Sequence, residues 1–273
     1  MSRPIDHGLV DAAIAPRGDA SARALLEDWL SERHARCALF LDVDGTLLDI
    51  AETPDAVQVP EALRAALETL HRQLGGALAL VSGRPLEQLD QLFAPLRLPA
   101  SGGHGADWRL HADATPQHAD AAPLPASLRE RLRELARRHP GVLLEDKRNS
   151  LALHYRAVPA AGPALAAELE RLLASAEGAA LRLLPGKRVF ELLAHAGDKA
   201  QAIRRLLQQE PFAGRQPLFI GDDVTDRPAL ALMPELGGLG LGVGQLPPGA
   251  SAAFADARAV REALIQAARR ARA

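Results

Sequence analysis

The chain has 273 residues with 48% apolar and only 3% aromatic side chains, which excludes an aromatic-rich β-sandwich and fits one large α/β domain or two smaller ones. Its formal net charge of -2, with acids and bases interspersed, excludes a basic face for nucleic acid or an anionic membrane. The single cysteine, Cys37, has no second thiol to pair with, so we interpret it as an inert core residue in a reducing compartment.

Residues 1–34 are predicted to form a lead-in followed by a helix. The first 20 residues mix proline, glycine and charge without a period and lack the apolar stretch of a signal peptide. From Ser21 to Arg36, leucines and Trp29 recur at helical spacing. No later window approaches about 18 unbroken apolar residues, so we expect a cytoplasmic protein without membrane contact.

Alternating strands and helices follow this first helix. The continuous apolar run "CALFLDV", from Cys37, is typical of a central parallel strand buried on both faces. Pro60 opens a helix with one stripe of leucines, Gly75 and Gly76 end it, and "ALALV" follows as a second buried strand. This β-α-β order predicts parallel neighbours joined by a right-handed crossover.

A smaller domain is predicted to be inserted at residues 108–192, where the alternation of buried strands and amphipathic helices is interrupted. Ser127 and Glu130 form a predicted capping box for a helix. "VLLED" and "LALHYR" predict one hairpin, and after another helix "ALRLL" and "RVFELL" predict a second. Helix, two strands, helix and two strands make a compact α/β cap between core segments 35–107 and 193–273.

The core resumes with a helix that starts at Lys199 and a third buried strand, "PLFI". The predicted fold class is therefore α/β, a Rossmann-like core of parallel sheet with helices on both faces, plus the inserted cap. Polar motifs follow the three strands at Asp42, Ser82 and Asp222. Because ligands of open α/β sheets bind beyond the carboxyl ends of the strands, these motifs should converge on one crevice.

Five aspartates lie in these motifs. So many carboxylates could not all stay ionised near one another without a cation. Since no histidine or cysteine stands at ligand spacing, the expected ion is Mg²⁺, which prefers oxygen ligands. The five are Asp42, Asp44, Asp222, Asp223 and Asp226.

The first motif has the residues for phosphoryl transfer. Asp42 and Asp44, at i and i+2 of an extended segment, should project to the same side, so one carboxylate can attack phosphorus while the other transfers a proton. Gly45 lets the chain turn so that backbone N–H groups can face phosphate oxygens. Ser82 and Lys199 supply the hydroxyl and the ammonium group expected beside a charged transition state.

Taken together, "DVDGT", "VSGR", "GDKA" and "GDDVTD" resemble the four signature motifs of the haloacid dehalogenase superfamily of phosphotransferases. The stretches "GGHGADWR", "LEDKRNSLALHYR" and "GKRVFELL" extend this to a resemblance to the trehalose-6-phosphate phosphatase family, from Ala38 to Ala250. The resemblance implies Mg²⁺-dependent hydrolysis of trehalose 6-phosphate to trehalose and phosphate through an aspartyl-phosphate. Arg227 and Ala200 depart from the family pattern, which affects local loop geometry more than the reaction.

The resemblance also implies roles for single residues. Asp42 is the expected nucleophile and a metal ligand, and Asp44 is the expected general acid and base with its backbone carbonyl on Mg²⁺. Asp222, with Asp223, is expected to complete the metal site.

Further residues are expected to bind the substrate, because a hydroxyl-rich ligand needs fixed donors and acceptors. In the cap, the expected contacts to the sugar without phosphate are Glu145, Lys147 and Glu191. Other candidates for substrate contact are Gly83, Arg84, His104 and Lys187.

Two alternatives stay open. The first is another sugar-phosphate phosphatase of the same superfamily, of the sucrose phosphate or mannosyl phosphoglycerate type. The second is a phosphate-binding regulatory module without enzymatic activity, since an aspartate cluster with a distant lysine also describes receiver domains; Asp44 and the inserted cap argue against it. In each case we expect a monomer with a small-molecule partner, and no nucleic acid or membrane.

Overall fold

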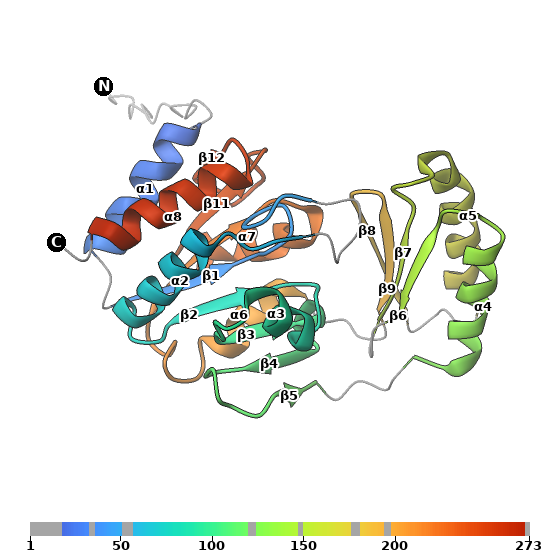
Figure 1. Ribbon diagram of the computed structural model, residues 1–273, viewed down its shortest axis with the longest axis horizontal. Coiled ribbons are helices and arrows are strands. Elements are labelled where there is room, and N and C mark those ends of the chain that lie inside the picture. The colour runs from blue at the N-terminus through green and yellow to red at the C-terminus, as the bar shows by residue number, and fades with distance from the viewer. Residues whose placement is uncertain are drawn as a thin grey trace, which may run out of the picture.

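The computed structural model describes residues 18–32, 36–50, 57–119, 124–146, 150–175, 181–193 and 198–270. Within these ranges the chain forms two β-sheets with their own helices, arranged as a larger and a smaller unit (Figure 1). Residues 1–17 of the predicted lead-in and the candidate residue Lys147 lie outside the described residues. No helix in the described ranges combines the length and the apolar character needed to cross a bilayer.

The larger sheet has eight strands within the described ranges. Neighbours from β12 to β3 are parallel, and β4 and β5 add antiparallel pairings at one edge. Strands β1 and β2 are buried along their whole length, which confirms the prediction from their apolar runs. In spatial order the strands are β12 (Ala252–Phe254), β11 (Leu239–Val243), β10 (Gln216–Gly221), β1 (Cys37–Leu41), β2 (Leu78–Val81), β3 (Ala100–Gly102), β4 (Asp107–Arg109) and β5 (Gln117–His118).

Helices cover both faces of this sheet, as predicted for the fold class (Figure 1). Three of them pack together on one face: α1 (Asp19–Glu32), α2 (Glu61–Gln73) and α8 (Ala257–Arg270). Two lie on the other: α6 (Lys199–Leu206) and α7 (Arg227–Glu235). The other helical segments of this unit among the described residues are α3 (Leu86–Phe93) and the short 3₁₀ turns η2 (Gly103–Gly105) and η4 (Val224–Asp226).

The core of the larger unit is aliphatic, with few aromatic contacts. Phe40 of β1 stacks on Phe212 with ring centroids 5.4 Å apart. Cys37 is completely buried at the start of β1, and burial raises the pKa of its thiol to about 12. The thiol therefore stays protonated near neutral pH, as expected of an inert core residue.

The smaller sheet is antiparallel throughout, in the order β6-β7-β9-β8. Both predicted hairpins are present. The strands are β6 (Leu143–Asp146), β7 (Ser150–His154), β8 (Arg182–Gly186) and β9 (Val189–Leu193), and the helical segments are α4 (Ala126–Arg137), η3 (Pro159–Ala161) and α5 (Gly162–Leu173). The predicted capping box is wrong: α4 begins at Ala126, so Ser127 lies inside the helix, and the N-cap is Pro125, whose side chain cannot accept a hydrogen bond.

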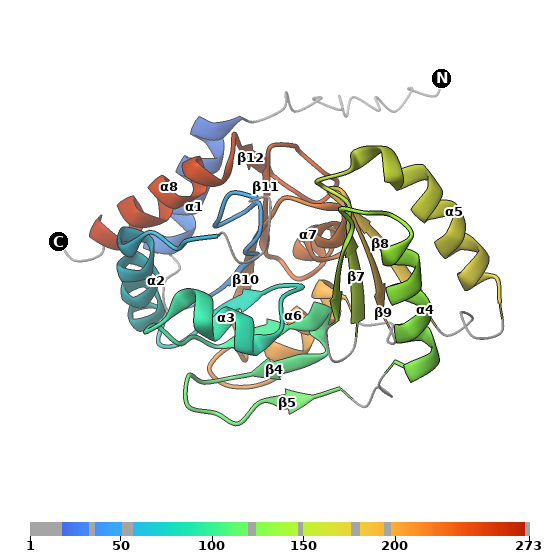
Figure 2. The ribbon, with the colours of Figure 1, turned by 45° about the vertical axis from the view of Figure 1, so that its right-hand side comes forward.

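Alternation along these strands gives the smaller sheet two different faces. One face carries leucines such as Leu151 and Leu192, which are buried in an apolar cluster with α4 and α5. The helices lie on the side away from the larger unit, so the other face is turned toward it (Figures 1 and 2). Register partners on that other face form the row Glu145, Ala152, Glu191 and Leu184.

We propose that the chain passes into the smaller unit after β5 rather than at residue 108. Strands β4 and β5 are paired to the larger sheet, through Ser101 opposite Trp108 and Asp107 opposite His118. Such short strands carry no readable period, so the sequence suggested a connection there. The proposed return near residue 193 lies at the end of β9, next to residues 194–197, which are outside the described ranges.

Replacing Leu169 with alanine tests this division into two units. Leu169 is fully buried in the apolar cluster of the smaller unit, so the free energy of unfolding should fall by about 2–5 kcal/mol. Hydrogen exchange should accelerate in β7 and β9 and stay unchanged in β1 and β10. Leu143→Ala, at a position that is 50% exposed, should change neither measurement. Equal acceleration in β1 would contradict two separate cores.

Candidate active site

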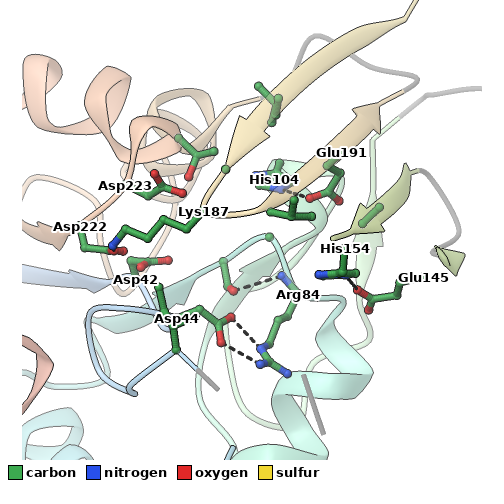
Figure 3. Close-up of a pocket in the computed structure, with 18 of the residues that line it drawn as sticks. Asp42, Asp44, Arg84, His104, Glu145, His154, Lys187, Glu191, Asp222 and Asp223 are labelled. Atoms are coloured by element: carbon green, nitrogen blue, oxygen red, sulfur yellow. Dashed lines mark hydrogen bonds and ion pairs between the residues drawn. The ribbon is translucent and has the colours of Figure 1, made fainter. Parts of the chain in front are cut away.

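One cavity of about 150 Å³ lies where the carboxyl ends of β1, β2 and β10 face the smaller sheet (Figure 3). The predicted convergence of the three motifs is therefore confirmed. The volume is below the range of about 300–1,000 Å³ usual for small-molecule pockets, so a disaccharide phosphate requires the cavity to widen. The larger unit contributes Asp42, Asp44, Ser82 and Asp222 to its lining, and the smaller unit contributes Glu145, Lys187 and Glu191.

Asp42 stands at the bottom of this cavity. Its backbone N–H donates to the Ile220 carbonyl at 3.0 Å, which continues the ladder between β1 and β10, and the residue is 4% exposed. Lys199, the first residue of α6, donates from Nζ to Asp42 Oδ1 and to Asp226 Oδ1, both at 2.6 Å. Asp198 caps α6 by accepting a hydrogen bond from the Gln201 N–H, which fixes the helix end that carries the lysine.

Burial dominates the electrostatics of these groups. It raises the pKa of Asp42 to about 6, and the charge of Asp226 adds to this effect while Lys199 opposes it. Burial, with the charge of Asp42, also raises the pKa of Asp222 to about 6. Burial by itself lowers the pKa of Lys199, but the Asp226 and Asp42 carboxylates outweigh it and the net pKa is raised. The lysine is therefore charged, and the carboxylates around it still repel one another.

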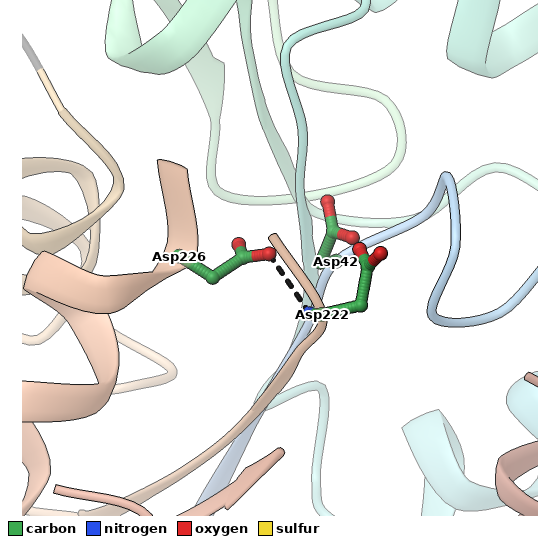
Figure 4. Close-up of side chains that lie close together, drawn as sticks. All are labelled: Asp42, Asp222 and Asp226. Carbon is green, nitrogen blue, oxygen red and sulfur yellow. Dashed lines mark hydrogen bonds between the residues drawn. The ribbon is translucent and has the colours of Figure 1, made fainter. Parts of the chain in front are cut away.

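Asp42, Asp222 and Asp226 form an acidic cluster, with one carboxylate oxygen of each within 4.8 Å of the others (Figure 4). The two oxygens of Asp226 are already engaged: Oδ1 accepts from Lys199, and Oδ2 accepts from the N–H groups of Asp222 at 3.0 Å and Asp223 at 2.9 Å. Asp226 thus orders the loop and the lysine, and Asp42 and Asp222 are better placed to hold a cation. Sequence analysis placed Asp226 among the five aspartates but assigned it no role. Its position four residues after Asp222 was the signal that the two could meet in one turn of the chain.

Gly45 makes the turn after Asp44 possible. Its φ is +89°, and a Cβ at this position would lie 2.3 Å from Asp222 Oδ2. The loop therefore needs glycine for both its backbone angle and its approach to the aspartate. The expectation that N–H groups of this loop face a phosphate is wrong for residues 45–48, since all four donate to the carbonyls of Val43 or Leu48.

Two residues predicted to bind metal have carboxylates outside the acidic cluster, although the ligand expected of Asp44 is its backbone carbonyl. The Asp44 carboxylate is 38% exposed and forms a two-pronged ion pair with Arg84, with Nε to Oδ2 and Nη2 to Oδ1 both at 2.7 Å (Figure 3). Asp223 Oδ1 accepts from the Val224 N–H at 2.7 Å and so caps η4. Metal binding by these two residues stays a prediction. Ser82 is buried beside them, and its Oγ accepts from the Arg84 N–H at 3.1 Å.

Two contacts across the cavity involve predicted substrate-binding residues (Figure 3). Lys187, in the turn between β8 and β9, donates to Asp222 Oδ2 at 2.6 Å. His104 Nε2 lies 2.9 Å from Glu191 Oε2, and the other oxygen of Glu191 accepts from Ser150 at 2.6 Å. Gly83 makes room for this pair, because a Cβ there would lie 2.5 Å from His104 Nε2.

A third contact joins Glu145 of β6 to Gln88 of α3, with Nε2 to Oε1 at 2.9 Å. The other oxygen of Glu145 lies 3.0 Å from His154 Nε2. Sequence analysis assigned no role to Gln88, Ser150 and His154, although the last two lie in the stretch "LEDKRNSLALHYR". The structure identifies Gln88 and His154 by their position in the cavity wall and Ser150 by its bond to Glu191.

Comparison with known proteins gives a consistent result. Residues 40–244 match the family model for trehalose-phosphatase. A probable trehalose-phosphate phosphatase of Sinorhizobium fredii is 44% identical over 247 residues, which cover 85% of this chain and 88% of the relative. A trehalose-6-phosphate phosphatase of Escherichia coli is 37% identical over 214 residues, covering 78% and 79%.

Solved structures share the fold. The C-terminal domain of trehalose-6-phosphate phosphatase from C. albicans aligns with a TM-score of 0.78 at 22% identity, over 90% of this chain and 96% of that domain. A trehalose-6-phosphate phosphatase of Aspergillus fumigatus aligns with a TM-score of 0.61 at 24% identity, over 91% and 97%. The predicted α/β fold class is thereby confirmed.

Replacing Lys199 with methionine should lower the free energy of unfolding by about 3–5 kcal/mol, because Asp42 and Asp226 would stay buried without their shared cation. Arg204→Met on the same helix is the matched control. Arg204 pairs with Glu235, and both side chains are more than half exposed, at 51% and 65%, so the change should cost less than about 1 kcal/mol. Urea unfolding at pH 8, where the carboxylates are ionised, measures both. Equal losses for the two variants would disprove the special role of the buried lysine.

Proposed function

Because the chain belongs to the trehalose-phosphatase family, we propose that it hydrolyses trehalose 6-phosphate to trehalose and inorganic phosphate. The observation that carries this proposal is the two-sided cavity. One wall has aspartates with the buried ammonium group of Lys199, which suits a phosphate and its counter-ion. The other has Glu145, Glu191 and His154, which suit sugar hydroxyls. We further propose that the enzyme acts as a monomer in the cytoplasm.

Asp42 is the proposed nucleophile. Lys199 holds Oδ1, so Oδ2 attacks the phosphorus while the bond from phosphorus to the C6 oxygen of the sugar breaks. Asp44 gives a proton to the leaving oxygen, and trehalose departs from an aspartyl-phosphate. Asp44 then takes a proton from the water that attacks this phosphorus, the bond to Asp42 breaks, and phosphate leaves. Arg84 orients Asp44 before the reaction and must release at least one of its oxygens for proton transfer.

The donor set around Asp42 fits Mg²⁺. Asp42 and Asp222 are buried carboxylates whose pKa is raised by burial and by neighbouring carboxylates, and hard oxygen ligands are those that Mg²⁺ prefers. We propose these two side chains as ligands, with the backbone carbonyl of Asp44 and with Asp223. When bound, the ion offsets the negative charge of the phosphate oxygens. Ser82 is proposed to donate its hydroxyl to one of those oxygens.

Release of inorganic phosphate from trehalose 6-phosphate, sucrose 6-phosphate and glucose 6-phosphate in Mg²⁺ tests the reaction and the substrate together. We expect the highest kcat/KM with trehalose 6-phosphate. Asp42→Asn, which removes the nucleophile, should lower kcat by on the order of 10⁴. Preference for another sugar phosphate would correct the substrate and retain the reaction. No turnover of any of them would favour the phosphate-binding module.

Mg²⁺ should raise the melting temperature more at pH 7.5 than at pH 5. In the folded protein the pKa of Asp42 and of Asp222 is about 6, above the value of about 4 for an unfolded aspartate. Without metal, the folded state therefore binds these protons more tightly, and stability is lost as the pH rises from about 4 through 6. Above that range the ionised carboxylates repel one another, so a bound cation should stabilise the folded protein more than it does at pH 5.

Thermal melts in EDTA and in Mg²⁺ at the two pH values measure this effect. Asp222→Asn removes one proposed ligand with little change in shape, so most of the Mg²⁺-dependent shift should disappear. A shift of the same size at both pH values, or one that survives in Asp222→Asn, would contradict the proposed metal site.

A further inference from the structure

Gln88 lies where the wall of the cavity passes from the larger to the smaller unit. It belongs to α3, whose residues Leu86, Leu89 and Phe93 are buried in the core of the larger unit. These anchors fix the helix relative to the phosphate-binding motifs, because α3 directly follows β2 and Ser82. Gln88 itself is half-buried and lines the cavity.

The carboxamide of Gln88 is engaged at one end only. Its Nε2 donates to Glu145 Oε1 at 2.9 Å, across the boundary between the units. Its Oε1 is buried and has no hydrogen-bond partner within the described residues. Buried polar atoms are nearly always paired, so this carbonyl oxygen is an acceptor for which the described part of the chain supplies no donor.

A second acceptor in the same chain of contacts is also unpaired. His154 Nε2 lies 3.0 Å from Glu145 Oε2 (Figure 3), and with the proton on Nε2 the other nitrogen, Nδ1, is an acceptor. Nδ1 is buried without a partner within the described residues. Glu145 thus lies between two side chains, each of which keeps one free acceptor beside the cavity. Hydroxyl groups are the donors that this arrangement suits.

We propose that Gln88 is a specificity-determining residue, whose Oε1 accepts a hydrogen bond from a hydroxyl group of the sugar while its Nε2 holds Glu145 in place. This inference rests on the proposed function and deepens it. Gln88 belongs to the unit that binds the phosphate, whereas Glu145 and Glu191 belong to the other. A sugar hydroxyl that contacts both Gln88 and Glu145 is bound completely only when the two units have closed over the substrate. A phosphate ester without sugar hydroxyls makes no such contact.

The test compares two kcat/KM values for each protein: that for the sugar phosphate which the unmodified protein hydrolyses best, and that for 4-nitrophenyl phosphate. Gln88→Leu keeps the approximate shape and removes both polar atoms, so the ratio of the two values should fall about 10- to 100-fold. Gln91→Leu is the matched control. Gln91 lies on the same helix, is exposed and does not line this cavity, so its ratio should equal that of the unmodified protein.

Gln88→Glu is the second variant, and melting temperatures verify that all variants are folded. It replaces the donor that faces Glu145 with a carboxylate oxygen, so the ratio should fall at least as far as in Gln88→Leu. If Gln88 only holds the two units together, kcat/KM falls equally for both substrates and the ratio is unchanged, which overturns the proposal. An unchanged ratio in a protein that does hydrolyse the sugar phosphate overturns the role of Gln88 alone. Failure of the unmodified protein on every sugar phosphate overturns the proposed function as well.

Discussion

The buried ammonium group of Lys199 is the interaction on which the rest of the active site depends. It bonds Asp42 at the end of β1 and Asp226 after β10, and so joins three different segments of the chain at one point. Asp226 in turn accepts from the N–H groups of Asp222 and Asp223 and holds that loop in shape. A charge buried this deeply is tolerable because it is paired twice, and the pairing leaves Asp42 with one oxygen for chemistry.

In the proposed function, the two units divide the recognition of the substrate between them. The larger sheet brings the ends of parallel strands together, which concentrates charge where a phosphate can bind. Side chains alternate along the strands of the smaller sheet: leucines pack against α4 and α5, and the row of Glu145, Ala152, Glu191 and Leu184 lines the cavity. These glutamates are bonded to Gln88 and His104 of the larger unit, so side chains of both units line the cavity together.

The two departures from the family pattern lie beside the reacting groups without disturbing them. Arg227 is exposed as the first residue of α7, and the loop before it is closed by Asp223 and Asp226, which cap η4 reciprocally. Ala200 follows Lys199 inside α6, where alanine favours the helix more than the glycine of the family pattern would. The geometry of the loop is thus set by backbone N–H groups and carboxylates, and neither departure removes one of them.

The sequence by itself determined whatever depends on neighbouring residues: the buried strands, the helical stripes, the motifs at strand ends and the class of chemistry that five aspartates, a serine and a lysine can perform. It also predicted both hairpins of the smaller sheet, because alternation is a local signal. The tertiary structure alone decided which distant groups meet. The pairing of β4 and β5 with the larger sheet, the bond from Lys199 to Asp226 and the contact of Gln88 with Glu145 join residues with no shared pattern. Such contacts follow from how the layers pack in space, and the local period of apolar residues does not encode that packing.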